Sequence, residues 1–314
     1  MAAHSVAAGA GRDVASGRMK RLIALCFVLL LAPGCSRFGA RTATTSSAQP
    51  RIVCISQQYN EIIYALGAQQ NLVGVDYSST YPPAIRSVQT VGYHRALSAE
   101  GILSLKPTVV VNDGNIGPPS VLQQLAQLSV PTKTFAAKDD SIDGLKALIR
   151  EMGAYFHEEP RAEQLCAKID ADLAKGQAAA TQYKSHPKVV VIHFGRASNV
   201  YLTVKANGGS GDGGAAGQMV RWAGGQMAIT GTGMQPLTSP EIIAKANPDV
   251  ILMTDYGYDR LGSLDAAKTL PGVAETNAAR TGRIYRVTEH DLMYYNPDSG
   301  ENIAKLAALI HQGE

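Results

Sequence analysis

A fourteen-residue stretch occurs twice in this chain, and this repetition constrains the fold more than any other feature. "SAEGILSLKPTVVV" at residues 98–111 aligns without a gap with "SPEIIAKANPDVIL" at residues 239–252. Each copy predicts a helix with Ser98 or Ser239 at its cap and an acid in its first turn. A proline then ends the helix before a buried strand. The duplication predicts two lobes of similar construction.

The openings of the two lobes are also alike. "RIVCIS" (51–56) and "KVVVIHF" (188–194) read as buried strands, and each precedes a helix that ends in glycine. Repeated alternation of strands and helices predicts an α/β protein with two Rossmann-like lobes and parallel sheets. We expect the first lobe over 51–140 and the second over 187–314.

Residues 141–186 connect the lobes and read as two helices. "SIDGLKALIREMGAYF" closes the first lobe, and residues 160–183 form a bridging helix able to span roughly 35 Å. One long α-helix between two similar lobes predicts a stiff clamp.

The start of the chain reads as an export signal. From Met19, which we take as the true start, two cations precede an apolar run too short to span a bilayer. The run ends in Ala-Pro-Gly-Cys, which resembles a bacterial lipobox with Cys35 as the lipidated residue. We therefore expect a signal peptide over 1–35, a flexible linker over 36–50 and a periplasmic protein tethered through Cys35. A protein secreted without a lipid is the alternative.

The charge of the mature chain argues against nucleic-acid binding. The whole chain carries a formal net charge of +3, and residues 1–34 account for all of it, with four basic residues against one acidic residue. The remainder is neutral, whereas a nucleic-acid binder carries a basic surface. Two cysteines lie beyond the leader, Cys54 and Cys166, and we expect two buried thiols.

The loop "VGYHRALS" just before the first repeat holds the candidate binding residues. A phenolate is a hard oxygen ligand for ferric iron, and Tyr93 can supply one. Arg95 can steady that charge or pair with a ligand carboxylate. In an extended loop Tyr93 and Arg95 face one side, so His94 is expected to face the other and to be exposed. The loop suits a ferric ligand that carries carboxylates.

Three segments together resemble a known family: "NEIIYALGAQQNLVGVDYSSTYP", "VGYHRALSAEGILSLKPTVVV" and "LTSPEIIAKANPDVILMTDYGYDRLG". They are similar to the periplasmic haem-binding proteins of bacterial haem ABC importers, which are class III periplasmic binding proteins. The resemblance implies two lobes joined by a long helix and haem b (hemin) as the transported ligand. Tyr93 would be the axial ligand of the haem iron. Arg95 would form a hydrogen bond with Tyr93 or with a haem propionate.

The resemblance also implies partners. An ABC permease and its ATPase would receive the ligand, with an outer-membrane haem receptor acting upstream. In this family, acids at the positions of Glu100 and Glu241 pair with arginines of the permease. A carboxylate that only favours its own helix dipole is the alternative at both positions.

The second lobe departs from the family pattern. Tyr256 stands where relatives carry a cation, so Tyr256 or Tyr258 could contact the porphyrin, with Arg260 supplying the charge. His193 is a further candidate ligand. Tyrosines packed on a loop and a core histidine are the alternatives. The glycine-rich segment 205–217 reads as a flexible edge of the cleft, because it lacks the lysine and hydroxyl of a phosphate loop.

Other functions fit less well. A ferric-siderophore or cobalamin binder would have the same lobes, but neither needs a tyrosinate. The scattered histidines disfavour a zinc binder. No nucleophile motif or triad is apparent, which argues against an enzyme.

Overall fold

The structure is a computed structural model that describes residues 50–136, 140–194, 200–203, 205–206, 214–231 and 234–313. The expected signal peptide, Cys35 and nearly all of the expected linker therefore lie outside the described residues, as does most of the glycine-rich segment. The two lobes themselves belong to one compact unit, Ala48–Glu314.

The first lobe alternates strands and helices along the chain: β1 (Ile52–Ile55), α1 (Gln57–Leu66), η1 (Gln69–Asn71), β2 (Leu72–Val75), η2 (Pro83–Ser87), α2 (Ala99–Leu103), β3 (Val109–Asn112), α3 (Pro119–Gln127) and β4 (Thr132–Lys133). The four strands form one sheet in the order β2-β1-β3-β4. Every pair in it is parallel, as the sequence predicted.

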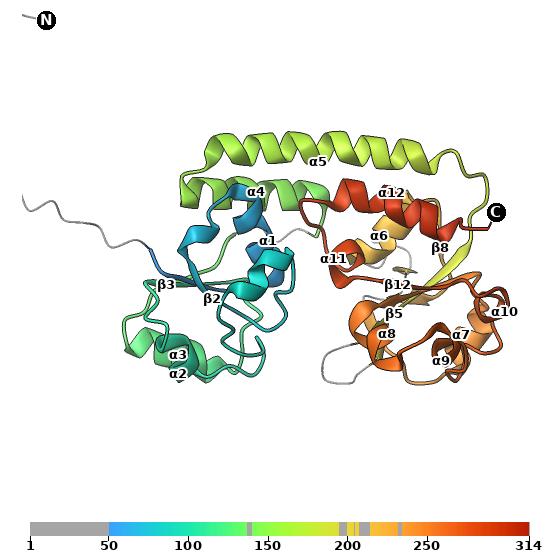
Figure 1. Cartoon of the computed structure of the whole chain (residues 1–314), viewed down its shortest axis with the longest axis horizontal. Coiled ribbons are helices and arrows are strands. Elements are labelled where there is room, and N and C mark those ends of the chain that lie inside the picture. The colour runs from blue at the N-terminus through green and yellow to red at the C-terminus, as the bar shows by residue number, and fades with distance from the viewer. Residues whose placement is uncertain are drawn as a thin grey trace, which may run out of the picture. The chain divides into compact units, whose positions relative to one another are not determined.

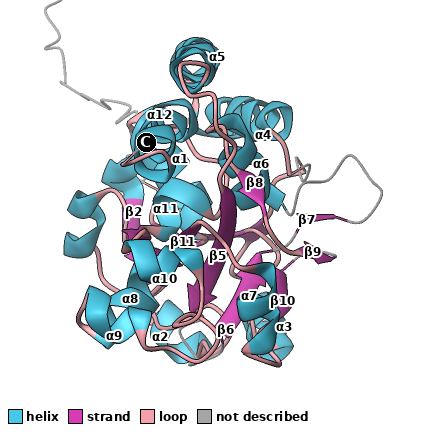
Figure 2. Ribbon diagram, turned by 90° about the vertical axis from the view of Figure 1, so that its right-hand side faces the viewer, coloured by secondary structure: helices cyan, strands magenta, loops and turns pink. Residues whose placement is uncertain are grey.

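The second lobe holds the remaining strands and most of the remaining helices: β5 (Lys188–Phe194), β6 (Val200–Thr203), β7 (Lys205–Ala206), α6 (Gly214–Trp222), β8 (Gln226–Met227), β9 (Thr230–Gly231), β10 (Met234–Pro236), α7 (Glu241–Ala246), β11 (Val250–Thr254), α8 (Asp255–Leu261), α9 (Leu264–Lys268), α10 (Asn277–Thr281), β12 (Ile284–Val287), α11 (Glu289–Leu292) and α12 (Ser299–Ile310). Strands β8, β5, β11 and β12 pair in parallel. Strands β6 and β10 extend this sheet in antiparallel fashion, which the sequence did not predict (Figure 2).

Both copies of the repeat form the predicted helix and strand, namely α2 with β3 and α7 with β11. In the first copy the Ser98 hydroxyl caps α2 by accepting the Gly101 N–H at 3.0 Å. The prediction that Ser239 caps α7 is wrong. Pro240 occupies the cap position with helical dihedral angles, and the Ser239 hydroxyl instead donates to the carboxylate of Glu241.

Two helices, α4 (Ile142–Phe156) and α5 (Glu159–Ala180), connect the lobes. Figure 1 shows α5 running along the same side of both lobes. Helix α12 of the second lobe packs tightly on α5, and Gly300 makes that approach possible. A Cβ at Gly300 would lie only 2.4 Å from backbone atoms of Asp172 and Leu173. Any larger residue there would force the two helices apart.

The central strands β1, β5 and β11 are buried on both faces. Successive residues of β5 alternate between two hydrophobic clusters, with Val189 and Val191 in one and Val190 and Ile192 in the other. The first of these clusters also holds residues of β1, α1, α4, α5 and α12, so it continues from one lobe into the other. One continuous hydrophobic core, which includes residues of α4, α5 and α12, therefore joins the two lobes.

The cysteine prediction is confirmed. Cys54 in β1 and Cys166 in α5 are both buried free thiols.

Candidate ligand-binding site

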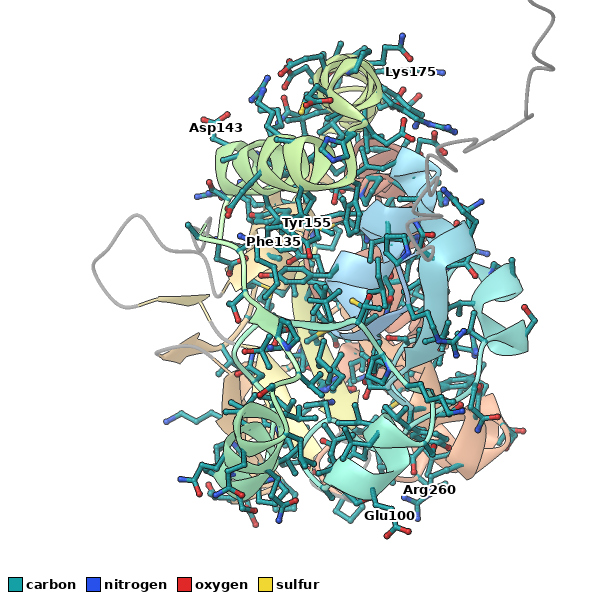
Figure 3. The ribbon with its side chains drawn as sticks, turned by 90° about the vertical axis from the view of Figure 1, so that its left-hand side faces the viewer. Glu100, Phe135, Asp143, Tyr155, Lys175 and Arg260 are labelled. Atoms are coloured by element: carbon teal, nitrogen blue, oxygen red, sulfur yellow. The ribbon has the colours of Figure 1, made fainter. Side chains whose placement is uncertain are left out.

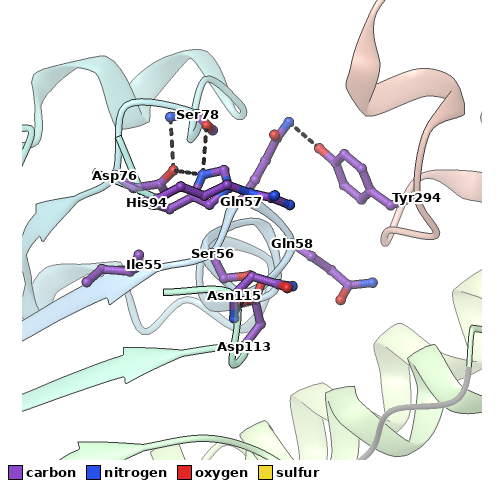
Figure 4. A pocket seen from close by; sticks show the side chains of 11 residues that line it. Ile55, Ser56, Gln57, Gln58, Asp76, Ser78, His94, Asp113, Asn115 and Tyr294 are labelled. Atoms are coloured by element: carbon purple, nitrogen blue, oxygen red, sulfur yellow. Dashed lines mark hydrogen bonds and ion pairs between the residues drawn. The ribbon is translucent and has the colours of Figure 1, made fainter. Parts of the chain in front are cut away.

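A pocket lies at the carboxyl edge of the first-lobe sheet. Ser56, Asp76 and Asp113 line it, and they are the residues that directly follow β1, β2 and β3. Figure 4 shows this arrangement, with Tyr294 of the second lobe on the opposite side. In open α/β sheets, ligands bind at this edge. The pocket encloses about 250 Å³.

A second hollow of about 260 Å³ adjoins it, and the two share Gln58, Asp113 and Asn115. Together they reach the size typical of sites for small organic ligands, about 300–1,000 Å³. Ile55 is the one aliphatic side chain among the residues that line the first pocket. The walls are therefore rich in amides, hydroxyls and carboxylates.

Backbone hydrogen bonds fix the loop that carries Tyr93, His94 and Arg95. The Gly92 carbonyl accepts the Tyr77 N–H at 2.7 Å, and the His94 carbonyl accepts the Gly117 N–H at 2.8 Å. Gly92 adopts a φ of +113°, which L side chains rarely adopt. The loop is thus held between the segments that follow β2 and β3.

Arg95 and His94 both line the pocket, whereas Tyr93 is not among its lining residues. Tyr93 is half-buried, and its ring centre lies 4.4 Å from that of His94. The expectation that His94 faces away from Arg95 is wrong. The Ala96 N–H bonds to the Tyr93 carbonyl at 2.8 Å, so these residues form a turn and the alternation of an extended strand does not apply.

A buried carboxylate anchors the polar side chains beneath this loop. Asp76 is 1% exposed, and its oxygens accept the Ser78 N–H at 3.0 Å and the Ser79 hydroxyl at 2.6 Å. His94 Nδ1 lies 3.3 Å from the Ser78 hydroxyl and 3.6 Å from the Asp76 carboxylate. The Nε–H of Arg95 donates to His94 Nε2 at 3.3 Å.

Tyr294 brings the second lobe to the pocket. Its hydroxyl accepts from Gln57 Nε2 at 2.5 Å and donates to the Glu61 carboxylate. Burial and the nearby Glu61 raise the pKa of Tyr294 well above its ordinary value, so the phenol stays neutral. Sequence reasoning missed Tyr294 because it lies in a short segment without periodicity after α11.

The candidate second-lobe ligands are not part of this pocket. Tyr258 packs against the core of its own lobe, and the Arg260 guanidinium lies 5.9 Å from the centre of the Tyr256 ring. His193 Nδ1 lies 3.9 Å from the Glu289 carboxylate. The pocket beside Arg95 is lined by none of the candidate ligands His193, Tyr256 and Tyr258.

A buried ionic cluster joins the two lobes next to the pocket. Glu61 of α1 and His290 of α11 are 3% and 6% exposed, and Glu61 Oε2 lies 2.9 Å from His290 Nδ1. The Asp298 carboxylate lies 3.5 Å from His290 Nε2 and accepts the Tyr81 hydroxyl at 3.2 Å. The Tyr81 ring stacks on His290 at 3.6 Å.

The contacts within this cluster shift the pKa values of its residues. Burial lowers the pKa of His290, but hydrogen bonds with Asp298 and Glu61 outweigh it and raise that pKa to about 9. The hydrogen bond with His290 lowers the pKa of Asp298 below its ordinary value. Burial raises the pKa of Glu61, although hydrogen bonds with His290 and Tyr294 offset part of the effect. His290 is therefore a buried cation at neutral pH.

Two other kinds of feature are absent from the described part of the chain. No three His, Cys, Asp or Glu side chains there gather closely enough to hold a bare metal ion. Nor does any helix within the described ranges combine the length and apolar character that crossing a membrane requires.

Comparison with known proteins identifies the family. The sequence profile of the periplasmic binding proteins matches residues 52–290. The chain belongs to this family, whose members are non-enzymatic, extracytoplasmic binding components of transport systems. The fold agrees, with two α/β lobes joined by a long helix.

Among solved structures, the chain resembles the periplasmic haem-binding protein RhuT from Roseiflexus sp. RS-1, with 33% identity and a TM-score of 0.73 over 84% of this chain and 98% of that one. It also resembles the haem-binding protein HutB of Vibrio cholerae, with 26% identity and a TM-score of 0.69 over 84% and 100% of the two chains.

The curated sequence relatives include a binding protein for a different ligand. A vitamin B12-binding protein of Pectobacterium atrosepticum is 29% identical over 51% of this chain, and the match spans 58% of that relative's length. An ABC transporter substrate-binding lipoprotein of Bacillus subtilis, YvrC, is 27% identical over 85% of this chain and 82% of its own length.

Proposed function

We propose that this protein binds haem, as hemin, in the cleft between its lobes and delivers it to the permease of an ABC importer. The observation that carries this proposal is the likeness to solved haem-binding proteins along nearly their whole length, at up to 33% identity. The experiment that tests it is an absorbance titration of the purified protein with hemin, in which a Soret band should grow to saturation.

The loop before α2 supplies groups that suit this ligand. The Tyr93 phenolate would bind ferric iron, and Arg95, at the pocket wall, would steady the phenolate or pair with a propionate. Tyr256, Tyr258 and His193 remain candidates for contacts from the second lobe. Because Ile55 is the one aliphatic residue that lines the pocket, the flat faces of the porphyrin would need further apolar walls along the cleft.

Cobalamin is the second candidate, and two observations favour it. The vitamin B12-binding relatives cover about half of the chain. The amides of Gln57, Gln58 and Asn115 in the pocket walls could pair with the amide groups of a corrin. No tyrosinate is needed for that ligand. A ferric siderophore is a weaker candidate, since such sites favour several cations and Arg95 is the one arginine or lysine that lines the pocket.

Glu100 and Glu241 are proposed to contact the permease. Both are exposed in the first turns of α2 and α7, the two copies of the repeat. Figure 3 shows Glu100 at the end of the molecule opposite α5, which carries Lys175. An open hollow beside Glu100 is edged by Leu128, which is 60% exposed. An exposed acid next to an apolar edge suits an arginine-bearing partner.

Reversing both charges, Glu100→Lys with Glu241→Lys, should abolish ligand uptake by cells and leave ligand affinity unchanged. The reason is that both acids lie outside the pocket, while two cations would repel the arginines of the permease. Uptake assays and hemin titrations of the same variant separate the two effects. If uptake continued at the rate of the unmodified protein, both acids would only stabilise their own helices through the helix dipole, by about 0.3–1 kcal/mol each.

Lipid attachment at Cys35 is proposed from the sequence. Cys35→Ala should move the protein from the membrane fraction to the soluble periplasmic fraction and remove the mass of a diacylglyceryl group. Unchanged fractionation together with an unchanged mass would rule out the anchor.

A further inference from the structure

The exposed side chain of Arg95 lies at the end of a chain of polar contacts that begins at a buried carboxylate. Asp76, directly after β2, is fixed by the Ser78 N–H and the Ser79 hydroxyl. His94 Nδ1 lies within 3.3 Å of the Ser78 hydroxyl, and His94 Nε2 accepts the Nε–H of Arg95 at 3.3 Å. The four residues Asp76, Ser78, His94 and Arg95 all line the same pocket.

The donors in this chain determine the tautomer of His94. An arginine Nε–H can only donate, so His94 Nε2 must carry the lone pair. The proton of a neutral His94 ring is then on Nδ1, where the Ser78 hydroxyl and the Asp76 carboxylate can accept it. Because the Nε2 lone pair faces Arg95, it is not available to a metal ion.

Only one edge of the guanidinium is used in this arrangement. The contact to His94 engages Nε, and among the described residues the structure gives no hydrogen-bond partner to the two Nη groups of Arg95. These groups retain the pair of parallel N–H donors with which arginine binds a carboxylate.

The charges of the pocket make the placement of Arg95 important. Asp76 and Asp113 also line it, and both would repel a ligand carboxylate. Arg95 is the single arginine or lysine among the lining residues. A mobile guanidinium would leave those two acids facing the ligand, whereas a fixed one gives a carboxylate a defined partner.

We propose that Asp76, Ser78 and His94 form a positioning relay that aims the Arg95 guanidinium at a carboxylate of the bound ligand. His94 is then a specificity-determining residue that makes the site prefer a ligand with free carboxylates. This inference rests on the proposed binding of hemin, whose two propionates are such groups.

The test compares hemin with its dimethyl ester, in which both propionates are blocked. The matched variants are His94→Gln, whose side-chain oxygen can accept near the position of Nε2, and His94→Asn, which reaches only as far as Nδ1. The unmodified protein should bind hemin at least about tenfold more tightly than the ester. His94→Gln should keep most of that preference, and His94→Asn should lose it, as Arg95→Ala does.

Absorbance distinguishes this role from iron ligation. The Soret band should be the same in the unmodified protein and both His94 variants, since positioning does not change the axial ligand. A full preference for hemin in His94→Asn would overturn the relay. So would a changed Soret band in the His94 variants, which would make His94 an iron ligand.

A measurement on the ligand-free protein tests the relay independently of the proposed binding of hemin. The ¹⁵N resonances of the His94 ring should report a proton on Nδ1, and Arg95→Ala should shift the Nε2 resonance. A proton on Nε2 would contradict the relay even if hemin binds. If the unmodified protein binds no hemin, the haem proposal fails, and the ring tautomer still decides whether the relay exists.

Discussion

Tyr93→Phe is expected to lower the affinity for hemin by about a hundredfold or more, because the substitution removes the proposed iron ligand and keeps the ring. A hundredfold loss corresponds to about 2.7 kcal/mol of binding free energy. The high-spin spectrum of a tyrosinate complex should disappear with it. Reduction to ferrous iron should also weaken binding in the unmodified protein, since the softer ion prefers imidazole or sulfur to phenolate.

Two variants serve as controls for this effect. Tyr155→Phe makes the same chemical change on α4, where Tyr155 packs edge-on against Phe135, and it should leave hemin affinity unchanged. Arg95→Ala should weaken binding less than Tyr93→Phe, because the iron bond remains. Unchanged affinity and spectrum in Tyr93→Phe would refute the assignment and leave His193, Tyr256 and Tyr258 as the candidate ligands.

His290→Leu is expected to lower the free energy of unfolding by about 3–5 kcal/mol, the usual cost of removing one partner from a buried ion pair. The substitution leaves the Glu61 carboxylate buried between the lobes without its cation. It also removes the stacked contact with Tyr81. Urea denaturation monitored by circular dichroism measures the loss.

The matched control is His157→Asn. His157 is an exposed histidine in the left-handed conformation at the end of α4, where asparagine is also favoured, so stability should change by less than about 0.5 kcal/mol. A loss below about 1 kcal/mol in His290→Leu would show that the buried cluster does not hold the lobes together.

The same cluster predicts how stability depends on pH. The pKa of His290 is raised to about 9 from an ordinary value of 6.5, so its contribution is fully present below about pH 6.5 and is lost as the pH rises through 9. Between these values the unmodified protein should lose about 1–3 kcal/mol more than His290→Leu does. If the free energies of unfolding of the two proteins changed in parallel with pH over this range, the raised pKa of His290 would be contradicted.

The sequence predicted the parts of the fold whose signals are local. The repeat at 98–111 and 239–252 predicted both helix–strand units, and the run before Tyr183 predicted the bridging helix α5 within a few residues. The antiparallel strands β6 and β10 were missed, because their pairing with β5 depends on residues distant in the chain.

The site was only partly predictable for the same reason. The segment from Tyr93 to Arg95 contributes His94 and Arg95 to the pocket, and its role in ligand binding stays a prediction. The direction of His94 depends on a turn closed by one backbone hydrogen bond, which no side-chain pattern reveals. The contact between Glu61 and His290 joins residues 229 positions apart, and neither residue stands in a recognisable motif.

Competition between hemin and cyanocobalamin decides whether the cleft binds haem, as we propose. Hemin titrated into the unmodified protein should give a saturating Soret band, with the number of haems per chain read from native mass spectrometry. An excess of cyanocobalamin should leave that band intact, and calorimetry should detect no binding of cyanocobalamin alone. Saturable binding of cyanocobalamin with no specific binding of hemin would refute the haem proposal.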